Sequence, residues 1–130
     1  FSYIQDVKMK NILGDIPTDN ISFLKSSDLK VGDPRIISNK EAITKLVAHY
    51  LMNEKNDKQL PVNDVCRFHL GNGAIIDDIV INANVSEVGF NRSFGVMVNY
   101  LYELKNIEKN HEEYINNKTI IVSDKIKKII

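Results

Sequence analysis

The sequence has few of the residues that mark several common protein classes. It contains one cysteine, no tryptophan and three prolines among 130 residues. Cys66 alone cannot form an internal disulfide, which fits a reducing, intracellular compartment. Lysine and arginine balance aspartate and glutamate at 17 each, so no net charge draws the chain to nucleic acid or to a membrane surface. No apolar run approaches the roughly 20 residues that span a bilayer, and no secretory signal is recognisable.

The remaining composition is that of an ordinary globular protein. Hydrophobic residues make up 43% and charged residues 26% of a chain long enough for one core. No repeat or low-complexity linker marks a boundary, so we expect residues 1–130 to form a single domain. The first residue is Phe1 rather than Met, which indicates a processed product or a fragment. Residues 1–39 are expected to form a lead-in of helix and loop.

Hydrophobic periodicity predicts the first firm helix over residues 40–53, where apolar residues recur at the i, i+3, i+4, i+7 spacing. Ser38 and Glu41 form a possible capping box at its start. A second, shorter helix is expected to begin at Asn63 or Asp64 and to place His69 at its C-terminal end. Further along, we expect strands over residues 75–85 and 96–104, a turn at 86–92, a helix over 106–116, an extended piece at 119–122 and a last helical turn that begins at Ser123. This order predicts an α/β or α+β domain with helices flanking a small mixed sheet.

His69 is the first candidate for a functional residue. An apolar segment leads it into a Gly-Asn-Gly break at residues 71–73, where residues that tolerate positive φ are needed. The break is expected to leave backbone N–H groups uncovered beside an imidazole that can donate or accept a proton. A lone histidine is more often a structural hydrogen-bonding group, so that alternative stays open at this point.

Three sequence blocks in a fixed order carry a family resemblance. Residues 67–74 read R-F-H-L-G-N-G-A, residues 93–102 read S-F-G-V-M-V-N-Y-L-Y, and residues 107–112 read I-E-K-N-H-E. The ordered set resembles the C-terminal part of malonyl-CoA decarboxylases, without a gap between His69 and Tyr102. The similarity covers about residues 43–123.

The resemblance implies a fold and an activity. The fold would be the C-terminal portion of a GNAT-like acyl-CoA fold, the catalytic half of these enzymes. The reaction would be decarboxylation of malonyl-CoA to acetyl-CoA and CO2 in fatty acid metabolism, without cofactor or metal, in a homo-oligomer. His69 would be the proton donor and hydrogen-bond donor. Its serine partner, in a Ser-Pro-Ile-Pro-Gly context, and the coenzyme A loop would precede Phe1, so the isolated chain is expected to be inactive. Relatives occur in cytosol, mitochondria and peroxisomes, and the sequence does not distinguish these compartments.

Two further residues are candidate substrate contacts. Asn72 could donate its amide to a carboxylate or thioester, although asparagine between glycines is also typical of a tight turn. Tyr102 shares a predicted strand face with Tyr100, and either hydroxyl could reach a thioester; core packing is the alternative. Ser86 matches a serine of the family pattern, where a cap or turn role is favoured.

Other chemistry-bearing residues favour structural roles. His111 is followed by two glutamates but lacks the second histidine of an H-E-x-x-H zinc motif, so we expect no metal site. Cys66 lies three residues before His69, and a buried, inert thiol is favoured over a nucleophile. His49 lies beside the apolar face of the first predicted helix and is expected at the surface or at the border of the core.

The sequence also departs from the family pattern. Val80, Ile81 and Asn84 replace the usual asparagine, tryptophan and aspartate, and Ile75 stands where a basic residue is usual. These changes motivate a second hypothesis, a non-catalytic module that binds acyl-CoA or completes an oligomer interface.

Overall fold

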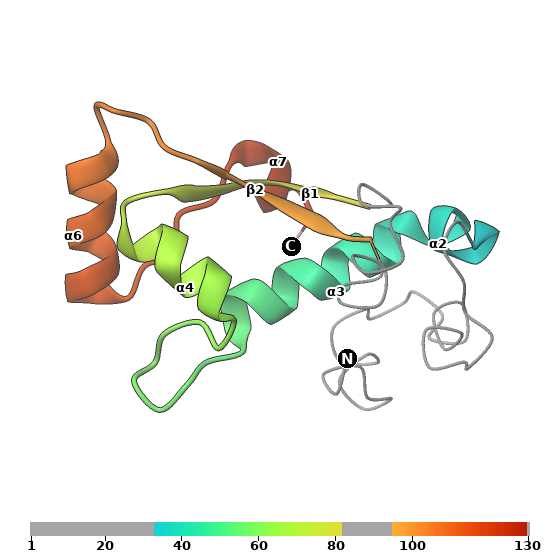
Figure 1. The fold of residues 1–130 in the computed structure, drawn as a ribbon, viewed down its shortest axis with the longest axis horizontal. Coiled ribbons are helices and arrows are strands. Elements are labelled where there is room, and N and C mark those ends of the chain that lie inside the picture. The colour runs from blue at the N-terminus through green and yellow to red at the C-terminus, as the bar shows by residue number, and fades with distance from the viewer. Residues whose placement is uncertain (1–32, 82–94, 130) are drawn as a thin grey trace. The chain divides into compact units, whose positions relative to one another are not determined.

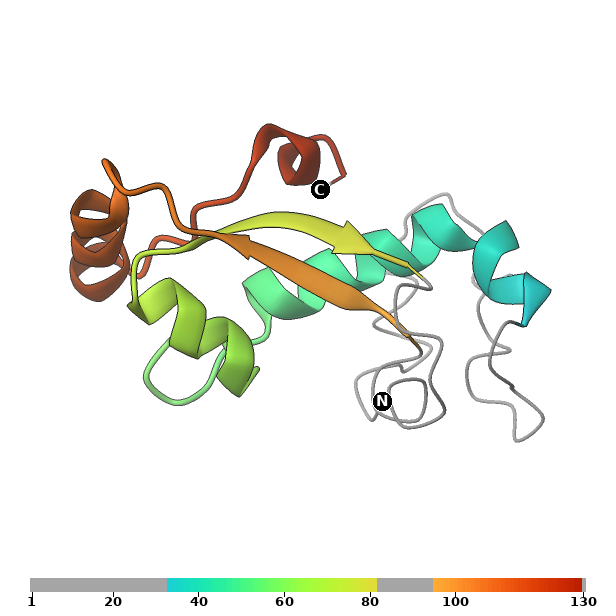
Figure 2. The ribbon, with the colours of Figure 1, turned by 45° about the horizontal axis from the view of Figure 1, so that its top comes forward.

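The computed structural model describes residues 33–81 and 95–129 of the chain. In these residues, strands β1 and β2 pair in an antiparallel sheet, and their arrowheads point in opposite directions in Figure 2. An isolated parallel bridge joins Ile76 to Val122. The elements labelled in Figure 1 are α2 (Pro34–Ser38), α3 (Lys40–Asn53), α4 (Asp64–Gly71), β1 (Ile75–Val80), β2 (Met97–Leu101), α6 (Ile107–Asn117) and α7 (Asp124–Lys127). The predicted combination of helices and a small sheet is confirmed, whereas the GNAT-like fold stays a prediction.

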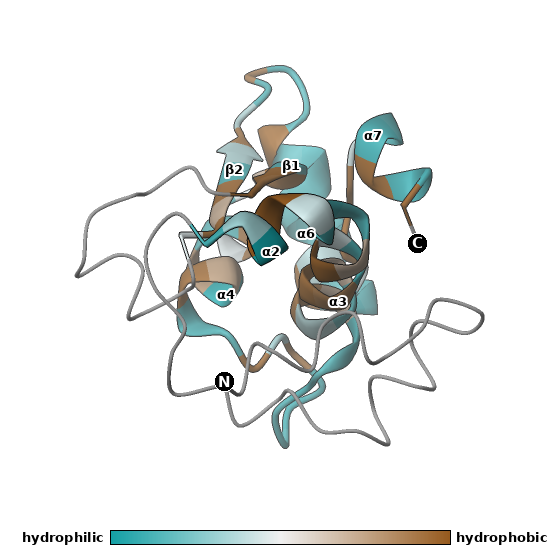
Figure 3. Cartoon of the chain, turned by 90° about the vertical axis from the view of Figure 1, so that its right-hand side faces the viewer, coloured by the Kyte–Doolittle hydropathy of each residue, from teal (hydrophilic) through white to brown (hydrophobic). Residues whose placement is uncertain are grey.

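Contacts divide the described residues into two compact units. The first comprises 33–47, 79–81 and 95–97, and its buried apolar side chains are Ile36, Ala42, Ile43, Leu46, Ile79 and Ile81. The second comprises 48–78 and 98–129, with a core that includes Leu51, Cys66, Leu70, Ile76, Tyr114 and Ile126. Figure 3 shows apolar colour on α3 and β1. The predicted site residues His69, Asn72 and Tyr102 all belong to the second unit.

Helix α3 has the bounds that its apolar spacing predicts, Lys40–Asn53. The prediction of its cap was wrong. Ser38 is the last residue of α2, and its hydroxyl donates to Pro34 O at 3.0 Å. Helix α2 lies within the predicted lead-in of residues 1–39, and it begins at Pro34 because the Asp33 carboxylate caps the Arg35 N–H and proline fits the first helical turn.

Helix α4 begins as predicted. Asn63 is its N-cap, and the side-chain oxygen accepts a hydrogen bond from Cys66 N at 2.9 Å. Asp64 in the first turn complements the positive end of the helix dipole. The helix therefore delivers His69 to its last turn, two residues before Gly71 ends it.

Both strands are shorter than predicted. Strand β1 ends at Val80, and Ile81 lies in a turn. In β2, Val98 and Tyr100 are half-buried and their neighbours are exposed, so the predicted alternation is confirmed that far. Beyond Leu101 the chain leaves the sheet and turns, and Leu104 is 90% exposed. Tyr102 therefore lies past the strand rather than on one strand face with Tyr100.

The C-terminal elements agree with their local signals. Helix α6 covers Ile107–Asn117, close to the predicted 106–116, and ends where Lys118 adopts a φ of 57°. Ser123 caps α7 by accepting from Ile126 N at 3.4 Å, while its hydroxyl donates to Asp77 O at 2.5 Å. Among the described helices, none combines the length and apolar character needed to cross a bilayer. Predictions for residues 1–32, for the turn at 86–92, and for Asn84 and Ser86 lie outside the described residues.

Candidate functional site

His69 contacts a residue that follows it by 33 positions. Its Nδ1 atom lies 2.6 Å from the Tyr102 hydroxyl oxygen. The imidazole is half-buried, and Tyr102 is 39% exposed. The end of α4 and the end of β2 therefore place an imidazole and a phenol in hydrogen-bond contact at a surface that a ligand can reach.

Aromatic rings fix the plane of the imidazole. Tyr100 stacks on His69 with ring centroids 4.4 Å apart and planes inclined by 18°. Phe68 approaches edge-on at 5.2 Å and 78°, and Tyr102 at 5.9 Å and 65°. Because stacking restricts rotation of the imidazole ring, the ring nitrogen that does not face Tyr102 keeps a defined direction.

A buried thiol lies behind the stacked tyrosine. Tyr100 and Cys66 share a side-chain hydrogen bond, in which the phenol donates to the sulfur. Burial raises the pKa of Cys66, although the Tyr100 bond and the nearby Lys55 oppose that rise. Burial, and then the proximity of Cys66, raises the pKa of Tyr100. Cys66 is 0% exposed, so the structure supports the inert thiol rather than the nucleophile.

The Gly-Asn-Gly break closes α4. Gly73 has a φ of 91°, as such a break requires, whereas Gly71 is still helical. Asn72 is the C-cap, and its Nδ2 donates to Phe68 O at 2.9 Å. The backbone N–H groups of Asn72, Gly73 and Ala74 donate to carbonyls of α4. The expectation that these N–H groups stand uncovered beside the imidazole was therefore wrong, because the helix end uses them. The substrate contact expected of Asn72 stays a prediction.

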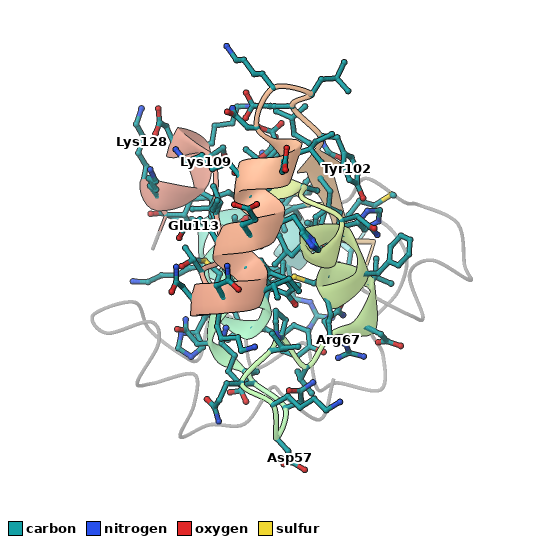
Figure 4. The ribbon with its side chains drawn as sticks, turned by 90° about the vertical axis from the view of Figure 1, so that its left-hand side faces the viewer. Asp57, Arg67, Tyr102, Lys109, Glu113 and Lys128 are labelled. Carbon is teal, nitrogen blue, oxygen red and sulfur yellow. The ribbon has the colours of Figure 1, made fainter. Side chains whose placement is uncertain are left out.

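Helix α6 packs against this helix end. His111 Nδ1 lies 2.6 Å from Gly71 O, and Asn110 Nδ2 donates to Gly73 O at 3.2 Å. Figure 4 shows α6 beside α4, with Lys109 and Glu113 projecting from α6. Within the described ranges, no group of three or more histidine, cysteine or acidic side chains is arranged to hold a metal ion. These contacts of Asn110 and His111 were not predicted from the sequence, although both residues stand in the I-E-K-N-H-E block.

A family profile matches almost the whole sequence. The match covers residues 3–130, and the profile describes the "Malonyl-CoA decarboxylase C-terminal domain". The chain belongs to the malonyl-CoA decarboxylase family. Its resemblance to that family, first drawn from the three sequence blocks, is confirmed.

Curated relatives and solved structures agree with this membership. The mitochondrial malonyl-CoA decarboxylase of Rattus norvegicus is 36% identical over 88 residues, which are 68% of this chain and 18% of that protein. The mitochondrial enzyme of Anser anser anser is 28% identical over 97% of this chain and 25% of its own length. The chain thus spans about a fifth to a quarter of these malonyl-CoA decarboxylases.

The fold also matches crystal structures of family members. Malonyl-CoA decarboxylase from Agrobacterium vitis superposes with a TM-score of 0.82 at 30% identity, over 98% of this chain and 31% of that one. The Rhodopseudomonas palustris enzyme gives 0.77 at 32% identity, over 85% of this chain and 26% of that one. The arrangement of helices and strands described above is therefore that of this malonyl-CoA decarboxylase domain.

Proposed function

We propose that the full-length protein carrying this chain decarboxylates malonyl-CoA to acetyl-CoA and CO2, with His69 as hydrogen-bond and proton donor. The observation that carries the proposal is the contact between His69 Nδ1 and the Tyr102 hydroxyl at 2.6 Å. Family membership supplies the substrate class. The contact gives the imidazole a fixed partner on one side. No described residue forms a hydrogen bond with its Nε2 atom, which the proposal assigns to the substrate.

In this reaction the negative charge that forms on the thioester oxygen must be stabilised before carbon is protonated. When the bond between the carboxylate and C2 of the malonyl group breaks, its electron pair moves onto the thioester oxygen and CO2 leaves. An N–H donor aimed at that oxygen stabilises the resulting enolate. In this proposal the Tyr102 O–H donates to His69 Nδ1, so the ring proton resides on Nε2 and is directed at the enolate.

Protonation of carbon completes the reaction. The Nε2 proton of His69 moves to C2 of the enolate and gives acetyl-CoA. The Tyr102 hydroxyl proton moves to Nδ1 as Nε2 releases its own, which keeps the imidazole neutral. Tyr102 is 39% exposed and regains a proton from water. The stack with Tyr100 keeps the ring in one orientation through both steps.

The test compares wild-type protein with His69→Asn at full length, measuring CO2 release from malonyl-CoA and substrate binding. We expect turnover to fall on the order of 100-fold or more, because both the oxyanion contact and the acid are lost. His49→Asn is a matched control, because His49 lies on α3 and bonds to Asn53 at 3.2 Å. Unchanged turnover in His69→Asn would contradict the proposal. An inactive wild-type protein that still binds malonyl-CoA would instead support the non-catalytic module.

A further inference from the structure

The C-terminal end of α4 is capped by side chains from a distant helix. An α-helix leaves its last carbonyls without helical partners. Here the turn after the helix satisfies part of them: His69 O accepts from Ala74 N at 3.1 Å, and Leu70 O from Gly73 N at 3.1 Å. The Gly71 and Gly73 carbonyls accept from His111 and Asn110 of α6. The end of α4 is therefore fixed by residues 37 and 40 positions further along the chain.

Packing at Gly73 leaves no room for a side chain. A Cβ atom added to Gly73 would overlap the Ile107 carbonyl oxygen and lie 2.8 Å from Ile107 Cγ2. Asn110 is 7% exposed, so its bond to Gly73 O is sealed from water. His111, in contrast, is exposed, and its Nδ1–H donates a short bond to Gly71 O. The negative end of the α4 dipole favours a donor at that place.

A short stretch of chain, from Tyr102 to the start of α6, connects that helix to the contact with His69. Tyr102 follows β2, and the turn closed by Asn106 N and Glu103 O at 2.8 Å leads directly into α6. His69 thus bonds to Tyr102 at one end of this stretch, while Gly71, two residues later, bonds to His111 at the other. A displacement of the last turn of α4 would lengthen both bonds.

We propose that His111 is a positioning residue for His69: its bond to Gly71 O holds the last turn of α4 where His69 Nδ1 meets the Tyr102 hydroxyl. This inference rests on the proposed function of His69. His111 touches neither the imidazole nor any reacting atom, and it acts through the backbone two residues beyond His69.

The test uses three variants of the full-length protein. His111→Ala removes the donor. His111→Asn restores one, because asparagine Nδ2 occupies nearly the place of histidine Nδ1. Glu112→Ala is the control, since Glu112 is the exposed neighbour on the same helix. Each variant is compared by kcat and KM for malonyl-CoA, by thermal unfolding, and by the 15N signals of the imidazole nitrogens, with His69→Asn identifying the His69 signals.

We expect His111→Ala to lower kcat by about 10-fold with little change in KM or unfolding temperature, because a misplaced donor costs rate more than binding. The His69 Nδ1 signal should shift as its bond to Tyr102 weakens. His111→Asn should restore most of the lost kcat and most of the His69 Nδ1 signal, and Glu112→Ala should change neither quantity. Unchanged kcat and unchanged His69 signals in His111→Ala would overturn the inference, as would a large fall in unfolding temperature that His111→Asn does not restore.

The two proposals fail in different ways. If His69→Asn leaves turnover unchanged, the proposed function fails, yet the His69 signals in His111→Ala still report whether the bond to Tyr102 depends on His111. If His69→Asn abolishes turnover and His111→Ala changes nothing, the positioning role alone is wrong.

Discussion

The two faces of α4 differ sharply in exposure. On one face Cys66 is 0% and Leu70 is 2% exposed, while Val65 and Phe68 on another face are 58% and 64% exposed. Close packing is enough to fix the buried face. His69, at the half-buried border, lacks that packing and is held by specific partners: a stacked ring and a hydrogen bond to its Nδ1. A side chain at such a border is not enclosed by core side chains, so directional contacts hold it instead.

The largest effect is expected from displacing the end of α4, because that displacement would move both the buried and the exposed face. We expect Gly73→Ala to lower the free energy of unfolding by about 3 kcal/mol, because its positive φ strains an L-residue and the added methyl meets the Ile107 carbonyl. Chemical denaturation measures this loss.

Gly71→Ala is the matched control for Gly73→Ala. Gly71 is helical, and a Cβ there would lie 3.8 Å from Tyr114 Cε1, an ordinary contact. Its effect on the free energy of unfolding should stay below about 1 kcal/mol. Equal losses in the two variants would show that the turn after α4 does not depend on the backbone of Gly73.

Tyr102→Phe in the full-length protein tests the directional contacts at the exposed border of α4. The variant keeps the ring and removes the hydroxyl that bonds to His69 Nδ1. We expect kcat for malonyl-CoA to fall about 10-fold while the unfolding midpoint hardly changes, because an exposed hydrogen bond adds little stability. A large loss of stability with normal kcat would instead give Tyr102 a structural role.

Two tyrosines interact with Cys66 on the buried face of α4, and they differ in hydrogen bonding. The Tyr100 phenol donates to Cys66, whereas the Tyr114 hydroxyl is buried without a hydrogen-bond partner among residues 33–81 and 95–129. Tyr100→Phe should therefore cost about 1 kcal/mol of unfolding free energy, and Tyr114→Phe should cost nothing or stabilise slightly. Urea unfolding of both variants measures the difference, and the reverse order would contradict this assignment of partners.

Tyr100→Phe should also change how stability depends on pH. Burial raises the pKa values of Cys66 and Tyr100 above their ordinary 9.0 and 10.0. The unfolded chain then releases these protons at lower pH than the folded chain, so stability is complete below about pH 9 and falls as pH rises further. Tyr100→Phe should make this alkaline fall less steep. An unchanged slope would mean that Tyr100 does not contribute to it.

Local signals in the sequence predicted most elements of the described part of the fold. The apolar spacing of α3 gave its bounds, and Asn63 and Ser123 capped the helices they precede. Such signals act over three or four residues, which explains their success. They failed where two local interpretations compete. Ser38 can either cap α3 or form the last residue of α2. The structure has the second arrangement, in which Ile36 of α2 is buried.

The sequence by itself determined the family, the presence of His69 at the end of a short helix, and the Gly-Asn-Gly break behind it. Only the tertiary structure decided what surrounds the imidazole. The partners Tyr102 and His111 meet His69 and Gly71 across 33 and 40 residues. Strand pairing, which ends at Leu101, fixes where Tyr102 leaves the sheet. No periodicity in the sequence encodes that end, because it depends on how far two strands distant in the chain remain paired.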